Sequence, residues 1–461
     1  MKQKLTDIAA WIQANGQQMD GIIVQGASID SRTVKEGDLF IPFRGEQVNG
    51  HKYVKQAIEK GAVASLWMID EPNPPEQLPL IFVDDPEFAL QEIARTYRGL
   101  LDCKVIGITG SNGKTSTKDL IASVLSPYYN VRKTVGNYNN ELGLPLTILS
   151  LDEDTEFAVL EMGMSNFGEI SFLSKLARPH YVVITNIGEA HLQDLGSREG
   201  IAKAKFEIVD GLIPGGKLFY DGDEVLLKDF VSQTTGIDLF SFGKDDQNAL
   251  SYQSVQSVEN GSLFTTVGIL EDEFMIPVYG SHQVKNTLAA ILLADQIGLS
   301  VEDIQKALSK ATLTDMRMQP LLSESGVLFI NDAYNSAPTS LSAALDFMNE
   351  TELRSKKWVI LGDMLELGEN EQKYHESFAG KLIAMNLEGV LLYGPLMESL
   401  YNELQKRDAK MKLVWSSDDF EPITDVIHKF TDEKSIVLLK GSRGLELENM
   451  LGIMMGNVDN I

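Results

Sequence analysis

The sequence predicts an α/β protein of three domains, with a central P-loop-type domain built on a parallel sheet and a Rossmann-like C-terminal domain. Three observations predict this class. The chain has 461 residues, which is too long for one ordinary hydrophobic core. Strand and helix patterns alternate from Cys103 onward. A Gly-rich turn joins the first of these strands to its helix.

We expect domain boundaries near residues 99 and 314, which divides the chain into segments 1–98, 99–313 and 314–461. The first segment has an irregular, turn-rich pattern that ends in a Pro-rich linker (EPNPPEQLP), a strand (LIFVDD) and a helix (FALQEIARTYRGLL). The central segment alternates strands such as KVIGIT, EFAVLEMG and HYVVITNIG with helices, and antiparallel strands follow over 250–280. The last segment alternates strand and helix throughout, as a doubly wound sheet does.

Acidic side chains outnumber basic ones by 66 to 40, which gives a net charge of −26. So acidic a chain is a poor general binder of nucleic acids or anionic membranes, because both attract positive surfaces. The single cysteine, Cys103, excludes an internal disulfide framework and a cysteine-based zinc site, and it fits a reducing compartment. No apolar run approaches ~18 residues and no signal-peptide core is visible, so we expect a cytoplasmic protein without a membrane span.

The strongest motif is a Gly-rich turn between a buried strand and a helix, made of Gly110, Ser111, Asn112, Gly113, Lys114, Thr115 and Ser116. Its glycines let backbone N–H groups point at an anion, and the helix N-terminus adds its dipole. Lys114 would reach the β- and γ-phosphates of a nucleotide, and the Thr115 hydroxyl would bind Mg²⁺. The common P-loop has glycine five positions before Gly113, where this chain has Ile108, so the loop is a variant. The alternative interpretation is a tight turn with a solvated lysine.

Two metal-binding residue types follow predicted strands further along the chain. Glu161 ends the strand FAVLE, and His191 follows the strand in VVITNIG. An open α/β sheet binds its ligands at the carboxyl ends of its strands. A carboxylate and an imidazole at this edge suit Mg²⁺ or Mn²⁺, with phosphate oxygens and water completing the shell. The alternative for His191 is a hydrogen-bonded structural histidine.

Other polar residues carry two interpretations each. Lys203 and Lys205 lie on one helix and are by pattern alone solvated lysines. The stretch GNYNNELGLP is either a turn or a polar loop that presents amides and a carboxylate to a metal or substrate. Three more residues are a cap or surface group in one interpretation and a contact to adenine, phosphate or ribose in the other: Asn286, Arg317 and Asp332.

A set of stretches occurs in an order known from one enzyme family: TGSNGKTSTK, GNYNNELGLPLT, EMGMSNFGEI, TNIGEAHL, the AKAKFE helix, NDAYNSAP, LGDMLELG and LLKGSRG. In this order they resemble the Mur ligases, and NYNNE, DAYNSAP and GDMLELG narrow the resemblance to the MurF type. The TGxNGKT loop alone would indicate only a wider family that includes folylpolyglutamate synthases. The N-terminal DSR, GDLF, RG and GH fit too, so the resemblance covers nearly the whole chain. One departure is Ser336-Ala337, where the MurF type often has Ala-Asn.

The resemblance implies a domain plan and a reaction. An N-terminal domain would bind a uridine nucleotide, a central domain would bind ATP, and a C-terminal domain would close the site. The enzyme would add D-alanyl-D-alanine to UDP-N-acetylmuramoyl-tripeptide through an acyl phosphate, in the cytoplasmic synthesis of peptidoglycan precursors. The hinged plan and the acidic surface favour a monomer without nucleic-acid or membrane partners.

The resemblance also assigns catalytic and metal-binding roles. Lys114 and two Mg²⁺ ions would offset the repulsion between ATP and the substrate carboxylate. Thr115 and Glu161 match the ligands of one ion, and His191 matches a ligand of the other. Lys205 matches a lysine that is carbamylated in the family, which turns a cationic amine into an anion able to bind or orient Mg²⁺. The sequence A-K-F-E favours Lys205 over Lys203 for this role.

Nucleotide and substrate contacts are implied in the same way. Asn286 would contact adenine, Arg317 the phosphates and Asp332 the ribose. The implied substrate contacts are Ser31, Arg32, Arg44, Asn139, Asn140, Glu141, Tyr334 and Asn335. The choice between Asn140 and Glu141 as the group beside the metal stays open, and the N-terminal residues are turn residues in the alternative interpretation. Lys440, Ser442 and Arg443 either contact the dipeptide or form a helix-start turn.

Two other functions are compatible with the phosphate loop. One is a ligase of the same fold that adds another amino acid, such as glutamate to a folate, and the GDMLELG and DAYNSAP stretches argue against it. The other is a nucleotide-binding scaffold with little hydrolysis. The combination of Lys114, Glu161, His191 and Lys205 argues against a scaffold.

Overall fold

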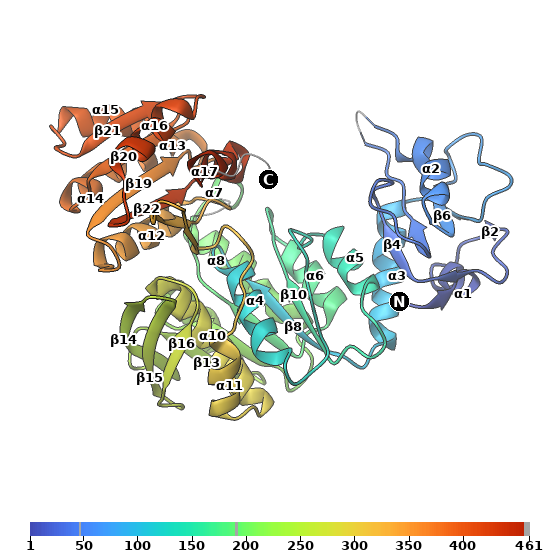
Figure 1. The fold of residues 1–461 in the computed structure, drawn as a ribbon. Helices are drawn as coiled ribbons and strands as arrows, with labels where there is room; N and C mark the ends of the chain where they lie inside the picture. Colours follow the sequence, from blue (N-terminus) through green and yellow to red (C-terminus); the bar gives the residue numbers. More distant parts are fainter. Residues whose placement is uncertain (46–47, 190–191, 456–461) are drawn as a thin grey trace.

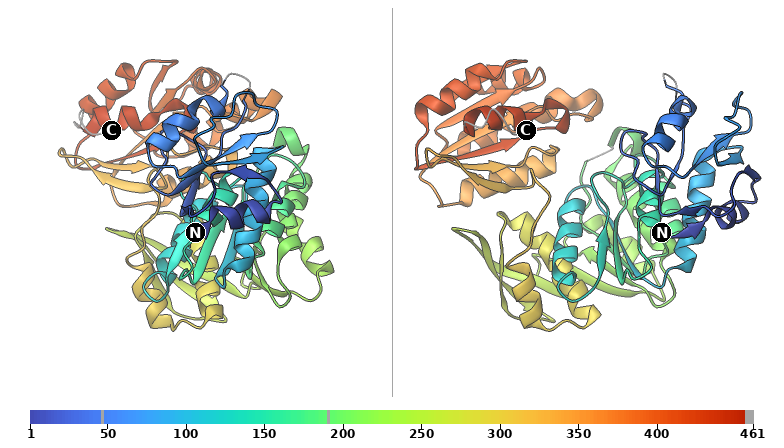
Figure 2. Two further views of the ribbon diagram at one scale, coloured as in Figure 1. Left: turned by 90° about the vertical axis from the view of Figure 1, so that its right-hand side faces the viewer. Right: turned by 45° about the vertical axis from the view of Figure 1, so that its right-hand side comes forward.

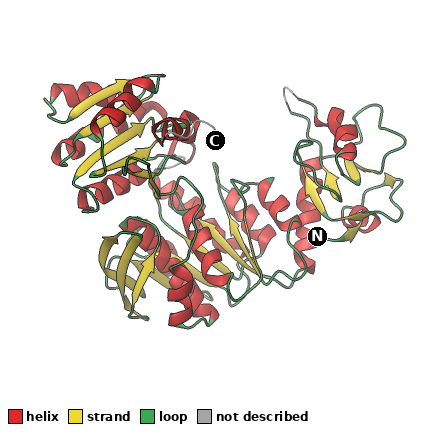
Figure 3. Ribbon diagram, in the orientation of Figure 1, coloured by secondary structure: helices red, strands yellow, loops and turns green. Residues whose placement is uncertain are grey.

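The computed structural model describes residues 1–45, 48–189 and 192–455, and it confirms the predicted α/β class. Three sheets carry the fold, and a two-stranded ribbon of β1 (Gln3–Lys4) and β3 (Ile23–Val24) accompanies the first of them. Figure 3 shows helices lying along the strands of the central and C-terminal sheets. In Figure 1 and in the right-hand view of Figure 2, the N-terminal and C-terminal segments lie at opposite ends of the central segment.

The N-terminal segment contains a five-stranded sheet in the order β2-β7-β6-β5-β4, parallel except for β2. Its strands are β2 (Gly16–Gln17), β4 (Gly26–Ser28), β5 (Asp38–Phe40), β6 (Ala64–Met68) and β7 (Leu80–Val83). Its helices are α1 (Leu5–Trp11), η1 (Gly50–Tyr53), α2 (Val54–Glu59) and α3 (Pro86–Leu100). The sequence pattern of this segment looked irregular because strands of two to five residues are too short to display a hydrophobic period.

The central segment holds a nine-stranded sheet in the order β16-β15-β14-β13-β12-β11-β8-β10-β9. The strands from β9 to β13 are parallel, and β14, β15 and β16 form the predicted antiparallel extension. The strands are β8 (Lys104–Thr109), β9 (Val131–Lys133), β10 (Phe157–Glu161), β11 (Tyr181–Ile184), β12 (Lys217–Asp221), β13 (Asp238–Gly243), β14 (Leu250–Val258), β15 (Gly261–Gly268) and β16 (Glu273–Ile276). The helices are α4 (Lys114–Leu125), α5 (Gly143–Leu149), α6 (Glu169–Ala177), α7 (Leu192–Leu195), α8 (Arg198–Phe206), η2 (Glu207–Gly211), α9 (Val225–Gln233), α10 (Ser281–Ile297) and α11 (Val301–Leu308).

The C-terminal segment forms a six-stranded sheet in the order β17-β18-β22-β19-β20-β21. Only β17, which lies at the edge, is antiparallel to its neighbour. The strands are β17 (Gln319–Leu322), β18 (Leu328–Asn331), β19 (Lys356–Gly362), β20 (Gly389–Tyr393), β21 (Lys412–Ser416) and β22 (Ser435–Lys440). The helices are α12 (Pro338–Glu350), η3 (Gly368–Asn370), α13 (Glu371–Ser377), α14 (Ala379–Ala384), α15 (Met397–Lys406), α16 (Glu421–Phe430), η4 (Arg443–Leu445) and α17 (Leu447–Met455).

The hydrophobic cores show how the segments are joined. One cluster of buried side chains runs from α1 and α3 into α5, β10 and α6, so the N-terminal and central sheets share a continuous apolar contact. The clusters on the two faces of the C-terminal sheet are built from that segment, except for Tyr279, whose ring stacks 5.5 Å from that of Phe347. A shared core resists relative movement, whereas a segment with its own core can move about its linker. Within residues 1–45, 48–189 and 192–455, the helices are too short or too polar to cross a membrane.

Candidate active site

The Gly-rich turn lies at the centre of the site, between β8 and the first residue of α4. Gly110 has φ 149° and Gly113 has φ 79°, which are left-handed conformations that favour glycine. A Cβ at Gly110 would lie 1.8 Å from Oγ1 of Thr185, and one at Gly113 would lie 2.5 Å from Oδ1 of Asn286. The glycines therefore provide both the backbone turn and the close packing of the loop against β11 and α10.

A cavity of about 1070 Å³ opens above this turn, between the carboxyl edge of the central sheet and the C-terminal segment. The registers of β10 and β11 on β8 place Glu161 beside Ile108 and Ile184 beside Thr109, so the three strands end at one level. Most of the sequence-predicted residues line this cavity: Ser111, Asn112, Gly113, Lys114, Thr115, Ser116, Asn139, Asn140, Glu141, Glu161, Lys205, Asn286, Arg317, Asp332, Tyr334 and Asn335.

Glu161 is the buried centre of a polar network at the end of β10. Its Oε2 accepts a hydrogen bond of 3.1 Å from the Thr115 hydroxyl, and its Oε1 accepts one of 3.0 Å from Nδ2 of Asn139. The amine of Lys118, one turn along α4, lies 3.7 Å from Oε2. The network brings the loop 137–141 against the phosphate loop, and Asn139 is the residue of that loop that bonds to Glu161.

Lys114, Lys205 and Arg317 are among the basic side chains that line the cavity. The Lys114 amine donates a hydrogen bond of 2.8 Å to the Gly110 carbonyl, and burial lowers its pKa, with Arg317 adding to the shift and Glu161 opposing it. Burial lowers the pKa of the Lys205 amine well below its usual range, and the nearby charge of Lys114 lowers it further. Nη2 of Arg317 lies 3.5 Å from the Thr115 hydroxyl. Lys114 and Arg317 beside the phosphate loop are suited to bind an anion there.

Several buried polar atoms around the cavity have no hydrogen-bond partner in the described part of the chain. They are Ser111 Oγ, Asn112 Nδ2, His282 Nδ1, Arg317 Nε and Ser336 Oγ. Buried polar groups are nearly always hydrogen-bonded, so a group without a protein partner is suited to bind a ligand or water. These five atoms come from the phosphate loop, α10 and the C-terminal segment, which a single polar ligand in the cavity would bridge.

The expected contacts to adenine and ribose are engaged within the protein. Asn286 donates to Gln283 at 3.1 Å, and Gln283 in turn donates to the Ser116 hydroxyl at 3.4 Å. Asp332 accepts 2.6 Å from the Lys440 amine through one oxygen and 3.1 Å from the Met318 amide through the other. Each oxygen of Asp332 thus accepts one hydrogen bond within the protein and has a second lone pair for a further donor.

Other predicted residues lie elsewhere. Ser31, Arg32 and Arg44 lie in the N-terminal segment and do not line the cavity. Arg32 is exposed and paired with Asp30, whereas Arg44 pairs with Asp70 and Glu71. Ser31 is buried and donates to Gln56 at 3.3 Å. His191, the expected second metal ligand, lies outside the described residues.

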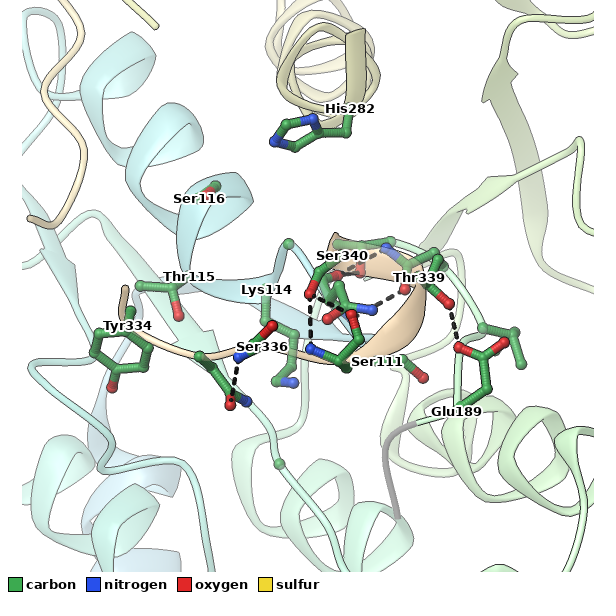
Figure 4. Close-up of a pocket in the computed structure, with 18 of the residues that line it drawn as sticks. Ser111, Lys114, Thr115, Ser116, Glu189, His282, Tyr334, Ser336, Thr339 and Ser340 are labelled. Atoms are coloured by element: carbon green, nitrogen blue, oxygen red, sulfur yellow. Dashed lines mark hydrogen bonds between the residues drawn. The ribbon is translucent and has the colours of Figure 1, made fainter. Parts of the chain in front are cut away.

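Sequence reasoning missed several residues of the site. Lys118 lies near Glu161, and His282 begins the wall that α10 contributes. Thr339, at the start of α12, donates a hydrogen bond to the Glu189 carboxylate, which joins the C-terminal segment to the central one (Figure 4). Helical spacing from Lys114 was the one available signal, and it points only to Lys118. The other contacts join elements far apart in the sequence and carry no local pattern.

Comparison with known proteins places this geometry in a family. Residues 108–294 match the Mur ligase middle domain, residues 316–443 the Mur ligase glutamate ligase domain, and residues 23–98 the Mur ligase family catalytic domain. The chain is 42% identical, over 98% of both chains, to the UDP-N-acetylmuramoyl-tripeptide–D-alanyl-D-alanine ligase of Bacillus subtilis. A crystal structure of MurF from Acinetobacter baumannii superposes with a TM-score of 0.89 at 27% identity, covering 99% of each chain. MurF ligase from Thermotoga maritima in complex with ADP gives 0.83 at 27% identity, covering 94% of this chain and 98% of that one.

The fold and the phosphate loop define a nucleotide-binding ligase, and the chain belongs to the Mur ligase family. Within that family it is of the MurF type. It is therefore an ATP-dependent ligase of peptidoglycan precursor synthesis.

Proposed function

We propose that this ligase joins D-alanyl-D-alanine to UDP-N-acetylmuramoyl-tripeptide. The observation that carries the proposal is the cavity itself, in which Lys114, Arg317 and the Thr115–Glu161 pair surround a space bounded by the C-terminal segment. Relatives that align over nearly their whole length bear this substrate pair in their names.

We infer the course of the reaction from membership of the Mur ligase family. The terminal carboxylate of the tripeptide attacks the γ-phosphorus of ATP, the bond to the β,γ-bridging oxygen breaks, and ADP leaves. The dipeptide amine then attacks the acyl phosphate, the amide forms, and phosphate leaves with the loss of one proton. Lys114 and Arg317 lower the barrier of the first step, because they neutralise charge that two anions bring together.

Magnesium fits the residues at the head of α4. The Thr115 hydroxyl and the Glu161 carboxylate are hard oxygen donors that lie 3.1 Å apart. Within the described residues, no group of three or more His, Cys, Asp or Glu side chains is placed to hold a metal ion. The arrangement suits Mg²⁺ bound through one or two protein oxygens together with phosphates and water. When bound, Mg²⁺ supplies charge neutralisation at the transferred phosphoryl group, and we propose His191 as a ligand of a second such ion.

We assign carbamylation to Lys205. The reaction requires a neutral amine, whose nitrogen attacks the carbon of CO₂ with loss of a proton and leaves an anionic N-carboxylate. Burial, together with the charge of Lys114, lowers the pKa of Lys205 and so favours that neutral form. Lys203 is exposed, and its amine lies 5.8 Å from the ring centroid of Phe167, which argues for Lys205 as the modified residue.

The remaining assignments concern the binding of the two substrates. We assign Asn286 to adenine and Asp332 to ribose, because each Asp332 oxygen accepts one hydrogen bond within the protein and can accept another from a ribose hydroxyl. We assign the uridine nucleotide to the N-terminal segment with Ser31, Arg32 and Arg44, and the substrate chain to Asn139, Asn140, Glu141, Tyr334 and Asn335. The corresponding domains are 1–98, 99–313 and 314–461. We propose that the enzyme acts as a monomer in the cytoplasm, where ATP is available.

The product identifies the substrates directly. The enzyme is incubated with MgATP, D-alanyl-D-alanine and the lysine or diaminopimelate form of the nucleotide tripeptide. The masses of the products are then measured by mass spectrometry. A product heavier than the tripeptide by one dipeptide minus one water establishes the proposal and its specificity. If neither form gains the dipeptide while a folate gains glutamate, the proposal is wrong and the folate-type ligase is correct.

A further inference from the structure

A fully buried carboxylate ties the phosphate-loop helix to the linker that leads into the C-terminal segment. Asp119 lies on α4, and its side chain has no exposed surface. Its Oδ2 accepts two hydrogen bonds from Thr314, one of 2.8 Å from the backbone amide and one of 2.7 Å from the hydroxyl. Its Oδ1 lies 2.6 Å from the Lys133 amine and 3.9 Å from that of Lys118. Burial of a carboxylate is unfavourable unless it is paired and hydrogen-bonded, and Asp119 is both.

Thr314 stands three residues before Arg317, in the linker between α11 and β17. The guanidinium of Arg317 lies 4.1 Å from the ring centroid of Tyr334, and Nη2 lies 3.5 Å from the Thr115 hydroxyl. The residues on both sides of Arg317 have left-handed backbones, with φ 61° at Met316 and 54° at Met318. Such conformations persist only where the surroundings hold them.

The linker is held from both sides, and Arg317 lies between the two sets of contacts. Beyond Arg317, the Met318 amide donates to Asp332 at 3.1 Å, which ties the chain to the C-terminal sheet. Before Arg317, Thr314 is bound to Asp119 on the phosphate-loop helix. If Thr314 lost its hydrogen bonds to Asp119, the linker could move with the C-terminal segment. Arg317 would then move away from the phosphate loop.

We propose that Asp119 is a positioning residue, which through Thr314 fixes the linker so that Arg317 faces the phosphate loop. Lys133 balances the buried charge of Asp119. The inference rests on the proposed contact of Arg317 with the phosphates of ATP.

Substitutions at both ends of the contact test the proposal. Thr314→Val removes the hydroxyl donor and keeps the branched shape, whereas Thr314→Ser keeps both donors. Asp119→Asn presents a single carbonyl oxygen, which cannot serve both Thr314 and Lys133. We expect Thr314→Val and Asp119→Asn to lower kcat about tenfold and to leave the KM of the nucleotide tripeptide unchanged. We expect Thr314→Ser to keep the wild-type kcat. Ser123→Ala is the matched control, because it removes a 3.4 Å contact to the Thr312 amide between the same helix and the same linker.

A double-mutant cycle separates positioning from a general structural effect. In the Arg317→Lys variant, Thr314→Val should change kcat by less than about twofold, because the guanidinium that Thr314 positions is already absent. Equal losses in both backgrounds, or an equal loss in Ser123→Ala, would overturn the proposal. Amide hydrogen exchange of the peptide around Thr314 provides a readout that needs no turnover, and we expect faster exchange in Asp119→Asn. Unchanged exchange in Asp119→Asn would refute the proposed role of the Asp119–Thr314 contact. If the wild-type enzyme is inactive with the proposed substrates but exchange is faster in the variant, only the proposed substrates are wrong.

Discussion

The Thr115 hydroxyl donates a hydrogen bond of 3.1 Å to Oε2 of Glu161, although the two residues are separated by 46 positions in sequence. Thr115 belongs to the helix that starts at the phosphate loop, and Glu161 ends the neighbouring parallel strand. The contact joins an alcohol and a carboxylate at the point where phosphates would meet the helix N-terminus. It is the relationship on which the proposed magnesium site depends.

Glu161→Gln should raise the Mg²⁺ concentration needed for half-maximal activity by about tenfold or more, because a neutral amide oxygen binds a hard cation more weakly than a carboxylate does. A magnesium titration at saturating ATP measures this. Glu169→Gln, which also changes a carboxylate that lines the cavity, is the control and should leave the requirement unchanged. An unaltered magnesium requirement in Glu161→Gln would remove Glu161 from the metal site.

Lys114→Ala should lower kcat by about a thousandfold, because it removes a preorganised charge from the phosphoryl transfer step. The fold should be preserved, with a melting temperature within about 3 °C of wild type, since the buried amine makes its hydrogen bond within its own loop. Normal turnover in this variant would contradict the assignment of the phosphate loop.

Lys205→Ala should be inactive and should regain part of its activity with short carboxylic acids, which replace the proposed carbamate. Lys203→Ala is the matched control, because Lys203 lies two positions away on the same helix. This variant should remain active. Turnover is measured with and without the added acid. A fully active Lys205→Ala, or an inactive Lys203→Ala that the acid restores, would show that the modified residue is not Lys205.

Acid should destabilise the protein through His282. Burial lowers the pKa of His282 from 6.5 to about 4 in the folded state. Between these values the unfolded chain binds a proton that the folded chain does not, so stability falls as the pH falls from about 7 to 4. The loss amounts to about 2 kcal/mol at pH 5.

A His282→Gln variant has no imidazole to titrate, so its stability relative to wild type should rise by that amount between pH 7.5 and pH 5. Urea unfolding at several pH values measures the difference. Curves that stay parallel across this range would show that His282 is not buried in its neutral form.

The sequence predicted those parts of the site that depend on local order. Gly110 to Thr115 follow a strand and begin a helix, and Glu161 ends a neighbouring strand of the sheet, so the sequence order predicts that both lie at one edge. A strand of five or six buried residues and a glycine turn leave few alternatives for the backbone.

The contacts that sequence reasoning missed depend on tertiary packing. The pairing of Asp332 with Lys440 spans 108 positions, and the bond from Thr314 to Asp119 spans 195. The local periodicity of the sequence does not indicate contacts between residues so far apart. The N-terminal sheet was missed for a different reason, since β2 and β4 have two and three residues and show no alternation. The sequence pattern marks Asp119 and Lys118 as ordinary polar residues of a helix, and they are buried because α10, α11, β10 and β9 pack around α4.

Phosphate release from MgATP, measured with the nucleotide tripeptide and D-alanyl-D-alanine added singly and together, tests the proposed ligase reaction most directly. We expect sustained release only when both are present, in equal amount with the amide product. Sustained release with neither substrate, or with D-alanyl-D-alanine alone, would contradict it, because the first step requires the carboxylate of the tripeptide.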